Sequence, residues 1–498
     1  MRWKVIAPLG SATVAGSRVR KGSAGRFAVA RTPTGRAVVF LIALFVVSRA
    51  IVLALGFHFD LEWLGLSIQN IDQRLLRHNL GQSLWHLHGQ PPLWNALLGI
   101  SLRVFPQHWP QVWHLGFLGL GLVEVLALFA LLLQLGLPRR VSAAIAAVFS
   151  IAPAVLVYEN VFLYDYPTLV LLTVMALAVA WFVAKPSFGR GSLVFGLGAC
   201  LVLLRTIFQF PWLLVVVALL VVACKGHHRT VLVSCALPLA LVFTIIAKSW
   251  FLYGVPSTTS WSGMMLARAA VVSLPLSERR RLVDEGKLHT VSLVTPLSAL
   301  SAYEAVGIKP APKTGIPLLD NPGDPLFPRN LENRTFIEIS RLYLQDDLWI
   351  IEHRPGAYLR SVGRGFADFF APPTIAWTGQ GNTGKIGAYD RWYSRIVYGR
   401  LGPGKDGLFL IAIYAFALIV GVWIAVRRLR PGADAATVTV SFALLAIVYL
   451  GVVGNFAEVG ENYRFRLVVD PLALSLTAMG IRRLALTVRS SASARRTG

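Results

Sequence analysis

The chain alternates between long apolar runs and short polar connectors, interrupted by one long polar section. The apolar runs that reach about 20 residues, or come near it, can cross a bilayer as helices. They lie near 37–57, 111–136, 141–158, 161–183, 191–210, 211–224, 230–252, 407–426, 437–455 and 466–486. The run 92–105 is too short to span and is followed by prolines, so we expect a juxtamembrane or re-entrant helix there. The pattern predicts an all-α polytopic membrane protein with about ten transmembrane helices.

Composition supports the same class. Only 14% of the 498 residues are charged, 55% are hydrophobic, and the mean hydropathy is +0.61. Soluble domains carry about a quarter charged residues. The deficit indicates that much of the chain avoids water.

The position of the basic residues predicts the orientation of the chain. The formal net charge is +24, but the arginines and lysines crowd residues 1–36, connectors such as Arg139-Arg140, and the tail after Arg482. Basic connectors are typical of the cytoplasmic side of a membrane protein. We therefore expect both termini in the cytoplasm and no nucleic-acid partner.

This topology divides the chain into five parts. They are a basic cytoplasmic tail (1–36), an N-terminal transmembrane module (37–252) with a large outer loop (58–110), an extracytoplasmic domain (253–406), C-terminal transmembrane helices (407–486) and a cytoplasmic tail (487–498). Of the 24 acidic residues, only Asp434 falls in a predicted cytoplasmic connector. The polar chemistry is therefore predicted on the outer face.

Two acids follow the first predicted span closely. Asp60 and Glu62 stand three to five residues beyond its end. A carboxylate at the edge of an apolar wall tends to have a raised pKa and can accept a proton from a hydroxyl as a general base. A solvated loop acid or a helix cap is the simpler interpretation of either residue.

The next outer turn adds Glu159 and Asp165 where two spans meet. Charged groups at membrane depth are costly, so they usually face a cavity or a partner. Asp165 precedes an aromatic residue and a proline, a pattern that also suits a capped first helical turn. Both interpretations stay open.

Arginines end the fifth span and open the last one. Arg205 lies near the outer end of the former, and Glu461, Arg464 and Arg466 belong to the run that opens the latter. Guanidinium groups bind phosphate in a bidentate manner, so this set is suited to a lipid phosphate. Snorkelling to headgroups is the alternative, with Glu461 paired to an arginine.

Histidines in the first outer loop offer ligands for a metal. His86 and His88, with Asp60 and Glu62, have the ligand types of a divalent-cation site. Loop histidines also occur commonly without metal, so the metal requirement stays open.

Together these motifs resemble the GT-C glycosyltransferases. They are the acid at Asp60, the segment His88-Gly89-Gln90-Pro91-Pro92-Leu93, the run Asp165-Tyr166-Pro167, and Glu461 to Arg466 before the final span. The likeness is closer to the bacterial branch related to protein mannosyltransferases and aminoarabinose lipid A transferases, of the family 39 type. It covers about 37–210 and 407–486, and it departs from the common His-Pro-Pro form at residues 88–92.

The resemblance implies a function at the outer face of the cell inner or plasma membrane. A sugar would pass, with inversion, from a polyprenyl-phosphate donor to a hydroxyl of a lipid, glycan or protein acceptor. Asp60 or Glu62 would be the base, and Arg464 or Arg466, with Arg205, would hold the phosphate. Glu461 belongs to the same substrate-binding set. His88, Gln90, Glu159 and Asp165 would bind or orient the substrates.

Two other classes fit the same residues. A transporter or lipid flippase would use the outer acids and arginines as a pathway, although transporters usually carry buried charges near the midplane. Here only Glu124 is placed mid-span. The third class is an assembly partner without catalytic activity.

Overall fold

The computed structural model describes residues 32–62, 64–65, 68–323, 329–375, 379–397, 399 and 407–496. In these residues the chain is helical, and the β-structure consists of one isolated bridge between Asp60 and Val161. The prediction of an all-α protein is confirmed.

Seven helices of the described chain are long and apolar enough to cross a membrane. They are α1 (Pro33–Ala54), α5 (Trp109–Gln134), α8 (Asp165–Ala184), α11 (His228–Tyr253), α20 (Leu408–Arg428), α21 (Ala435–Ala457) and α22 (Tyr463–Arg496). A polytopic membrane protein is thereby supported.

The other three predicted spans are shorter. Helix α9 (Phe188–Leu204) has 17 residues and α10 (Phe210–Ala223) has 14. The predicted span 141–158 is divided into α6 (Arg139–Ser150) and α7 (Pro153–Tyr158). Pro153 starts the second piece because it lacks the N–H that a continuous helix would need. Seven helices are therefore long enough to be candidate spans, and the short run near 92–105 forms the helix α4 (Pro92–Val104).

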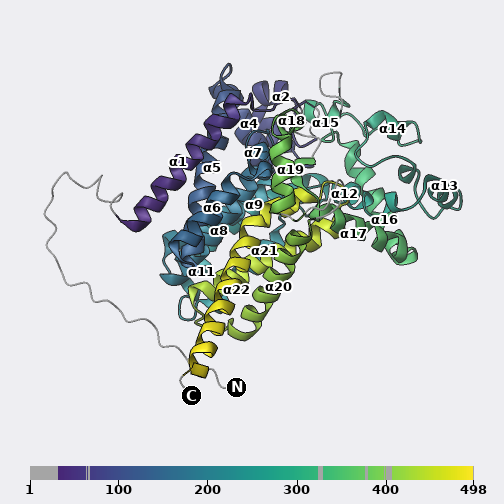
Figure 1. Cartoon of the computed structure of the whole chain (residues 1–498). Helices are drawn as coiled ribbons and strands as arrows, with labels where there is room; N and C mark the ends of the chain where they lie inside the picture. The colour runs from purple at the N-terminus through teal and green to yellow at the C-terminus, as the bar shows by residue number, and fades with distance from the viewer. Residues whose placement is uncertain are drawn as a thin grey trace.

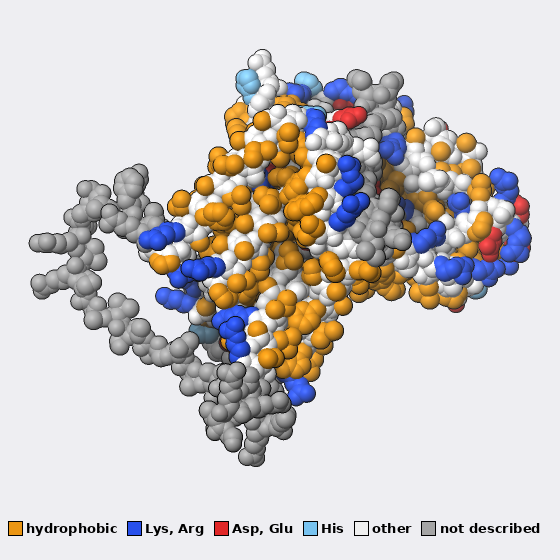
Figure 2. All heavy atoms as spheres, in the orientation of Figure 1, with side chains coloured by type: hydrophobic (Ala, Val, Ile, Leu, Met, Phe, Trp, Pro, Cys, Tyr) orange, Lys and Arg blue, Asp and Glu red, His pale blue; other side chains and the backbone are white. Residues whose placement is uncertain are grey.

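Helix α8 is the centre of the bundle, and α1 lies at its edge. Buried residues make up 72% of the apolar window of α8 but 22% of that of α1. Helices α5, α9, α21 and α22 all pack against α8. On α1, Val46 and Ile51 are exposed, and Figure 2 shows that apolar side chains cover this face of the bundle. Such a surface suits contact with lipid.

The section between α11 and α20 builds a second unit beside the bundle, which we call the lateral module (residues 254–375). Its helices are α12 (Ser262–Ala267), α13 (Leu276–Asp284), α14 (Leu300–Glu304), α15 (Pro317–Asp320), α16 (Thr335–His353) and α17 (Pro355–Phe370), with 3-10 turns at Val271–Ser273, Thr290–Leu293 and Pro373–Ile375. It has its own apolar core, which includes Trp261, Tyr303, Phe336 and Tyr343. Helix α17 packs against α21 and α22, and Figure 1 shows α13 and α14 projecting away from the bundle.

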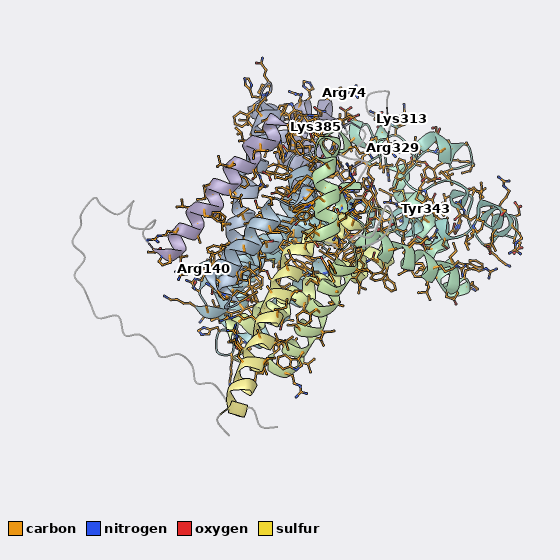
Figure 3. The ribbon with its side chains drawn as sticks, viewed as in Figure 1. Arg74, Arg140, Lys313, Arg329, Tyr343 and Lys385 are labelled. Carbon is orange, nitrogen blue, oxygen red and sulfur yellow. The ribbon has the colours of Figure 1, made fainter. Side chains whose placement is uncertain are left out.

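Four short helices complete the described chain. They are α2 (Gln73–His78), α3 (Leu80–His86), α18 (Gln380–Lys385) and α19 (Gly387–Ile396). Figure 1 shows α2, α4 and α18 at the end of the bundle away from the C-terminal end of α22. Figure 3 shows Arg140, at the start of α6, far from Arg74, Arg329 and Lys385. The connectors predicted as cytoplasmic and as outer thus lie at opposite ends.

Candidate active site at the end of the helix bundle

A cavity of about 640 Å³ lies between the end of the bundle and the lateral module. Small-molecule sites usually have about 300–1,000 Å³. Among the described residues that line it, the charged ones are four arginines and two glutamates: Arg205, Arg268, Arg329, Arg464, Glu458 and Glu461. Gln90, Gln209 and Thr259 supply neutral polar groups, and Tyr164, Trp261 and Phe465 supply aromatic ones. We call the part of the lining formed by the four arginines the cationic wall, and the part formed by Gln90, Gln209 and Thr259 the polar wall.

The cationic wall is organised by Asp165, the first residue of α8. Its Oδ2 atom accepts from Arg464, with Nη2 at 2.6 Å and Nε at 3.2 Å. Its Oδ1 atom lies 2.7 Å from Nη2 of Arg205. Asp165 is completely buried and sits at a helix N-terminus, where the helix dipole stabilises an acid. The end of α9 and the starts of α8 and α22 thus meet in one ion-pair cluster.

Arg205 is held by its neighbours on three sides. It pairs with Asp165, and its guanidinium group also stacks over two aromatic rings. The ring centroids of Tyr164 and Phe465 lie 5.3 and 5.0 Å from its Cζ atom. Its Nη1 atom is buried and has no hydrogen-bond partner among the described residues. A buried donor without a partner is costly. An anionic group in the cavity would satisfy it.

The turn before α22 holds a strained backbone. Gly460 and Glu461 both have positive φ, at +101° and +62°. Glu461 and Leu297 (φ +67°) are the non-glycine residues with positive φ in the described chain, and both line the cavity. Arg464 Nη1 donates to Glu461 Oε2 at 2.8 Å. Strained backbone often gathers at functional sites because the surrounding structure must hold it in place.

A second ion pair joins this turn to the lateral module. Arg268, which follows α12, pairs with Glu458. Its Nη2 atom lies 2.9 Å from the place where a Cβ at Gly460 would be. The positive φ of residue 460 favours glycine, and a Cβ there would require the Arg268 guanidinium to shift.

Of the first-loop residues, Gln90 lines the cavity and His88 lies behind it. The His88 ring is buried, with Nδ1 at 2.7 Å from Ser260 Oγ and Nε2 at 2.9 Å from the Glu332 carbonyl oxygen. Burial lowers its pKa to about 3, so the ring is neutral at pH 7. His88 is therefore a neutral residue outside the described cavity lining, bound to Ser260 and Glu332.

Asp60 and Glu62 are outside the described cavity lining. Asp60 is buried; its N–H donates to the Asn160 carbonyl at 2.7 Å, and its own carbonyl accepts from Phe162 N–H at 3.0 Å. Its carboxylate accepts the N–H of Glu62 at 2.9 Å, while Glu62 is exposed. The chain reaches the cavity at Ile68.

Glu159 and Arg466 make separate buried contacts. Glu159 pairs with Arg49 of α1, which also donates to Ser150. Arg466 Nη2 donates to the Ala371 carbonyl at 3.2 Å, and its Nη1 lies 3.8 Å from Asp470. The structure does not bring either residue to the described cavity wall. Their contacts join helices to one another.

The predicted cation ligands lie with other partners. His86 Nδ1 is 3.3 Å from the hydroxyl of Tyr253, and His88 is enclosed by Ser260 and Glu332 as described above. The described part of the chain has no group of three or more His, Cys, Asp or Glu residues that could hold a metal ion. A divalent cation stays a prediction from the residue types.

Sequence reasoning missed the contribution of the lateral module. Arg268, Trp261 and Arg329 line the cavity, and Glu332 stands behind it. They fall in the long polar section, where spacing alone does not single them out. Glu458 could have been predicted as a site residue, since it stands three residues before Glu461 in the same outer turn.

Comparison of the chain with protein-family models, curated proteins and solved structures finds no match.

Proposed function

We propose that the protein is a membrane glycosyltransferase that moves a sugar from a polyprenyl-phosphate donor to an acceptor hydroxyl on the extracytoplasmic face, with inversion. The acceptor is a lipid, a glycan or a protein. The observation that carries the proposal is the pairing of Asp165 with Arg205 and Arg464 on the wall of a 640 Å³ cavity at one end of the apolar bundle. A donor whose tail lies in the bilayer can present its phosphate there.

The cationic wall suits the leaving group. Transfer breaks the bond between the anomeric carbon and a phosphate oxygen, and negative charge grows on the phosphate. Arg205 and Arg464 stabilise this charge, because fixed guanidinium groups in a site shielded from water interact strongly with phosphate. Asp165 keeps both groups in place and balances part of their charge before the donor binds.

The polar wall suits the sugar. Gln90 lines the cavity, and Thr259, which also lines it, donates its hydroxyl to the Gly89 carbonyl oxygen at 2.7 Å. Neutral amide and hydroxyl groups recognise sugar hydroxyls through hydrogen bonds.

We assign the base to Asp60 rather than Glu62. In the transfer, the acceptor oxygen forms the new bond to the anomeric carbon, and its proton passes to the Asp60 carboxylate. Asp60 lies outside the described cavity lining, but it is buried and is fixed by the bridge to residues 160–162, which lead to Tyr164 on the cavity wall. The assignment therefore requires that the acceptor hydroxyl reach Asp60 from the edge of the cavity. Glu62 is exposed and free of such constraint.

The test is an assay of glycosidic bond formation in membrane vesicles. Vesicles that contain the protein are given a polyprenyl phosphate with a labelled sugar and a membrane fraction as acceptor, and the labelled product is separated from the lipid. We expect Asp60→Asn and Arg464→Ala to lose at least about 100-fold in turnover. Glu62→Gln and the control Arg281→Ala, an exposed pair with Glu285, should retain it.

Two results would contradict the proposal. Full turnover in Asp60→Asn would remove the base assignment. Movement of the labelled lipid across the membrane without a new glycosidic bond would show a transporter or flippase instead.

A further inference from the structure

The segment from His86 to Pro91, between α3 and α4, is bound by residues that lie far away in the chain. Its carbonyl oxygens accept from four groups: Tyr253 Oη to His86, the last residue of α3, at 2.8 Å, Lys248 Nζ to Leu87 at 2.7 Å, Ser260 N–H to His88 at 2.8 Å, and Thr259 Oγ1 to Gly89 at 2.7 Å. The donors come from α11 and from the chain that enters the lateral module. We call residues 86–91 the clamped loop.

Two N–H groups of the clamped loop donate to the same side chain. Oε2 of Glu332 accepts from His88 N–H at 3.0 Å and from Gly89 N–H at 2.8 Å. Glu332 is 5% exposed. Hydrogen bonds to a carboxylate are stronger than those between neutral groups. A single buried acid from the lateral module therefore fixes two successive peptide units.

The same part of the module fixes the loop sterically. The Nε1 atom of Trp261 lies 2.1 Å from where a Cβ at Gly89 would be, so the indole packs directly on the glycine backbone. Trp261 Nε1 also donates to the Leu331 carbonyl at 3.1 Å, next to Glu332. Gly89 is thus held both by its hydrogen bond to Glu332 and by its packing against Trp261.

We propose that Glu332 is a positioning residue, which holds the clamped loop so that the Gln90 amide is presented to the substrate in the cavity. Gln90 is the next residue after the two bound peptide units, and it lines the cavity. Burial of a carboxylate is costly unless it is hydrogen-bonded, and the N–H groups of His88 and Gly89 supply these bonds to Glu332. This inference rests on the proposed function, because the substrate that Gln90 meets is the one assigned above.

The first experiment measures kcat and KM of Glu332→Ala and Glu332→Gln at matched amounts of folded protein. Alanine removes the acceptor, and we expect kcat to fall about 10–100-fold because the amide of Gln90 is misplaced. Glutamine keeps an amide oxygen that accepts both N–H groups, and it should recover at least a third of the wild-type kcat. The control Glu338→Ala, an exposed glutamate of α16, should match the wild type.

A double variant separates positioning from fold stability. If Glu332 acts through Gln90, adding Gln90→Ala to Glu332→Ala causes little further loss. Independent and additive losses would overturn the proposal. So would a Glu332→Ala variant that yields less folded protein but keeps the full kcat per folded molecule.

The second experiment does not depend on catalysis. Gln90→Cys, with Cys200, Cys224 and Cys235 replaced by alanine, is labelled with a maleimide. We expect labelling at least about fivefold faster with Glu332→Ala added and an unchanged rate with Glu332→Gln, because a freed loop exposes residue 90 more often. Equal rates in all three would overturn the positioning role. If the wild type transfers no sugar but the labelling rates still differ, the proposed function is rejected and the effect of Glu332 on the clamped loop is retained.

Discussion

Asp165 binds Arg464 with one carboxylate oxygen at 2.6 Å and faces Arg205 with the other at 2.7 Å. Arg464 is 299 residues away from Asp165 along the chain. All three side chains are nearly inaccessible to solvent. Glu461 also pairs with Arg464, so these four groups balance in charge. The four arginines that line the cavity still outnumber the three acids Asp165, Glu458 and Glu461, which leaves one net positive charge for a phosphate.

We expect Arg464→Ala to destabilise the protein by about 3–5 kcal/mol, because it removes one partner from a buried carboxylate. Arg464→Lys should recover part of this loss, since an ammonium group keeps the charge but not the fork geometry. The measurement is thermal unfolding of detergent-purified protein. Arg281→Ala is the matched control, because exposed ion pairs contribute about 0–1 kcal/mol. Equal unfolding temperatures for Arg464→Ala and the control would show that the cluster contributes little.

Gly89→Ala tests the packing of Trp261 on the clamped loop. The new Cβ would lie 2.1 Å from the indole, so the loop or the ring must move. We expect a loss of about 1–3 kcal/mol in the free energy of unfolding, as for other overpacked sites.

Gly81→Ala is the control for this substitution. Gly81 lies in α3, and a Cβ there has no neighbour within 4 Å. Alanine should be neutral or slightly stabilising in a helix. Similar unfolding midpoints for the two variants would contradict the close packing at Gly89.

The sequence allowed the prediction of Asp165, Arg205 and Arg464. A charged side chain at membrane depth is energetically costly, so it usually faces a partner or a cavity. The same criterion selected Glu159, which the structure pairs with Arg49 away from the described cavity wall. The criterion finds buried charge but does not separate a substrate site from a contact between helices. That difference depends on where the helices meet.

Glu332 and Arg268 could not be predicted for another reason. Glu332 meets Gly89 across 243 residues, and Arg268 meets Glu458 across 190. Neither lies in an apolar run, so the energetic argument that drew attention to Asp165 does not apply to them. Only the fold of the lateral module brings them to the site. The seven long apolar helices, by contrast, follow from local hydropathy. Three predicted spans do not reach that length: the run that Pro153 divides and the helices α9 and α10.

The orientation of the chain predicts which end accepts a membrane-impermeant thiol reagent. Arg140→Cys and Lys313→Cys, each in a background without native cysteines, place exposed probes at opposite ends of the molecule (Figure 3). We expect labelling of residue 313, and not of residue 140, in intact cells or sealed right-side-out vesicles, because basic connectors stay in the cytoplasm. The reverse result would place the cavity on the cytoplasmic side and exclude the proposed donor geometry.

Glu332 and His88 predict opposite effects of pH on stability. Burial raises the pKa of Glu332 from 4.5 to about 7 and lowers that of His88 from 6.5 to about 3. Between pH 4.5 and 7 the folded protein keeps a proton on Glu332 that the unfolded chain releases, so this group's contribution to stability is lost as pH rises. Between pH 6.5 and 3 the unfolded chain protonates His88 and the folded protein does not, so that contribution is lost as pH falls. The two slopes cancel between pH 4.5 and 6.5.

Glu332→Gln removes the first contribution and leaves the second. Relative to the wild type, the variant should therefore gain stability as pH rises from 4.5 to 7, by up to about 3 kcal/mol at roughly 1.4 kcal/mol for each pH unit. Lys248 is the other charged group that faces Glu332, and its positive charge favours the ionised carboxylate in the wild type, which lowers the pKa of Glu332 and makes the difference smaller. Unfolding midpoints of both proteins, measured in detergent at several pH values, give the difference directly. Curves that run parallel would show that Glu332 is ionised in the folded protein over this range, held so by the N–H groups of His88 and Gly89.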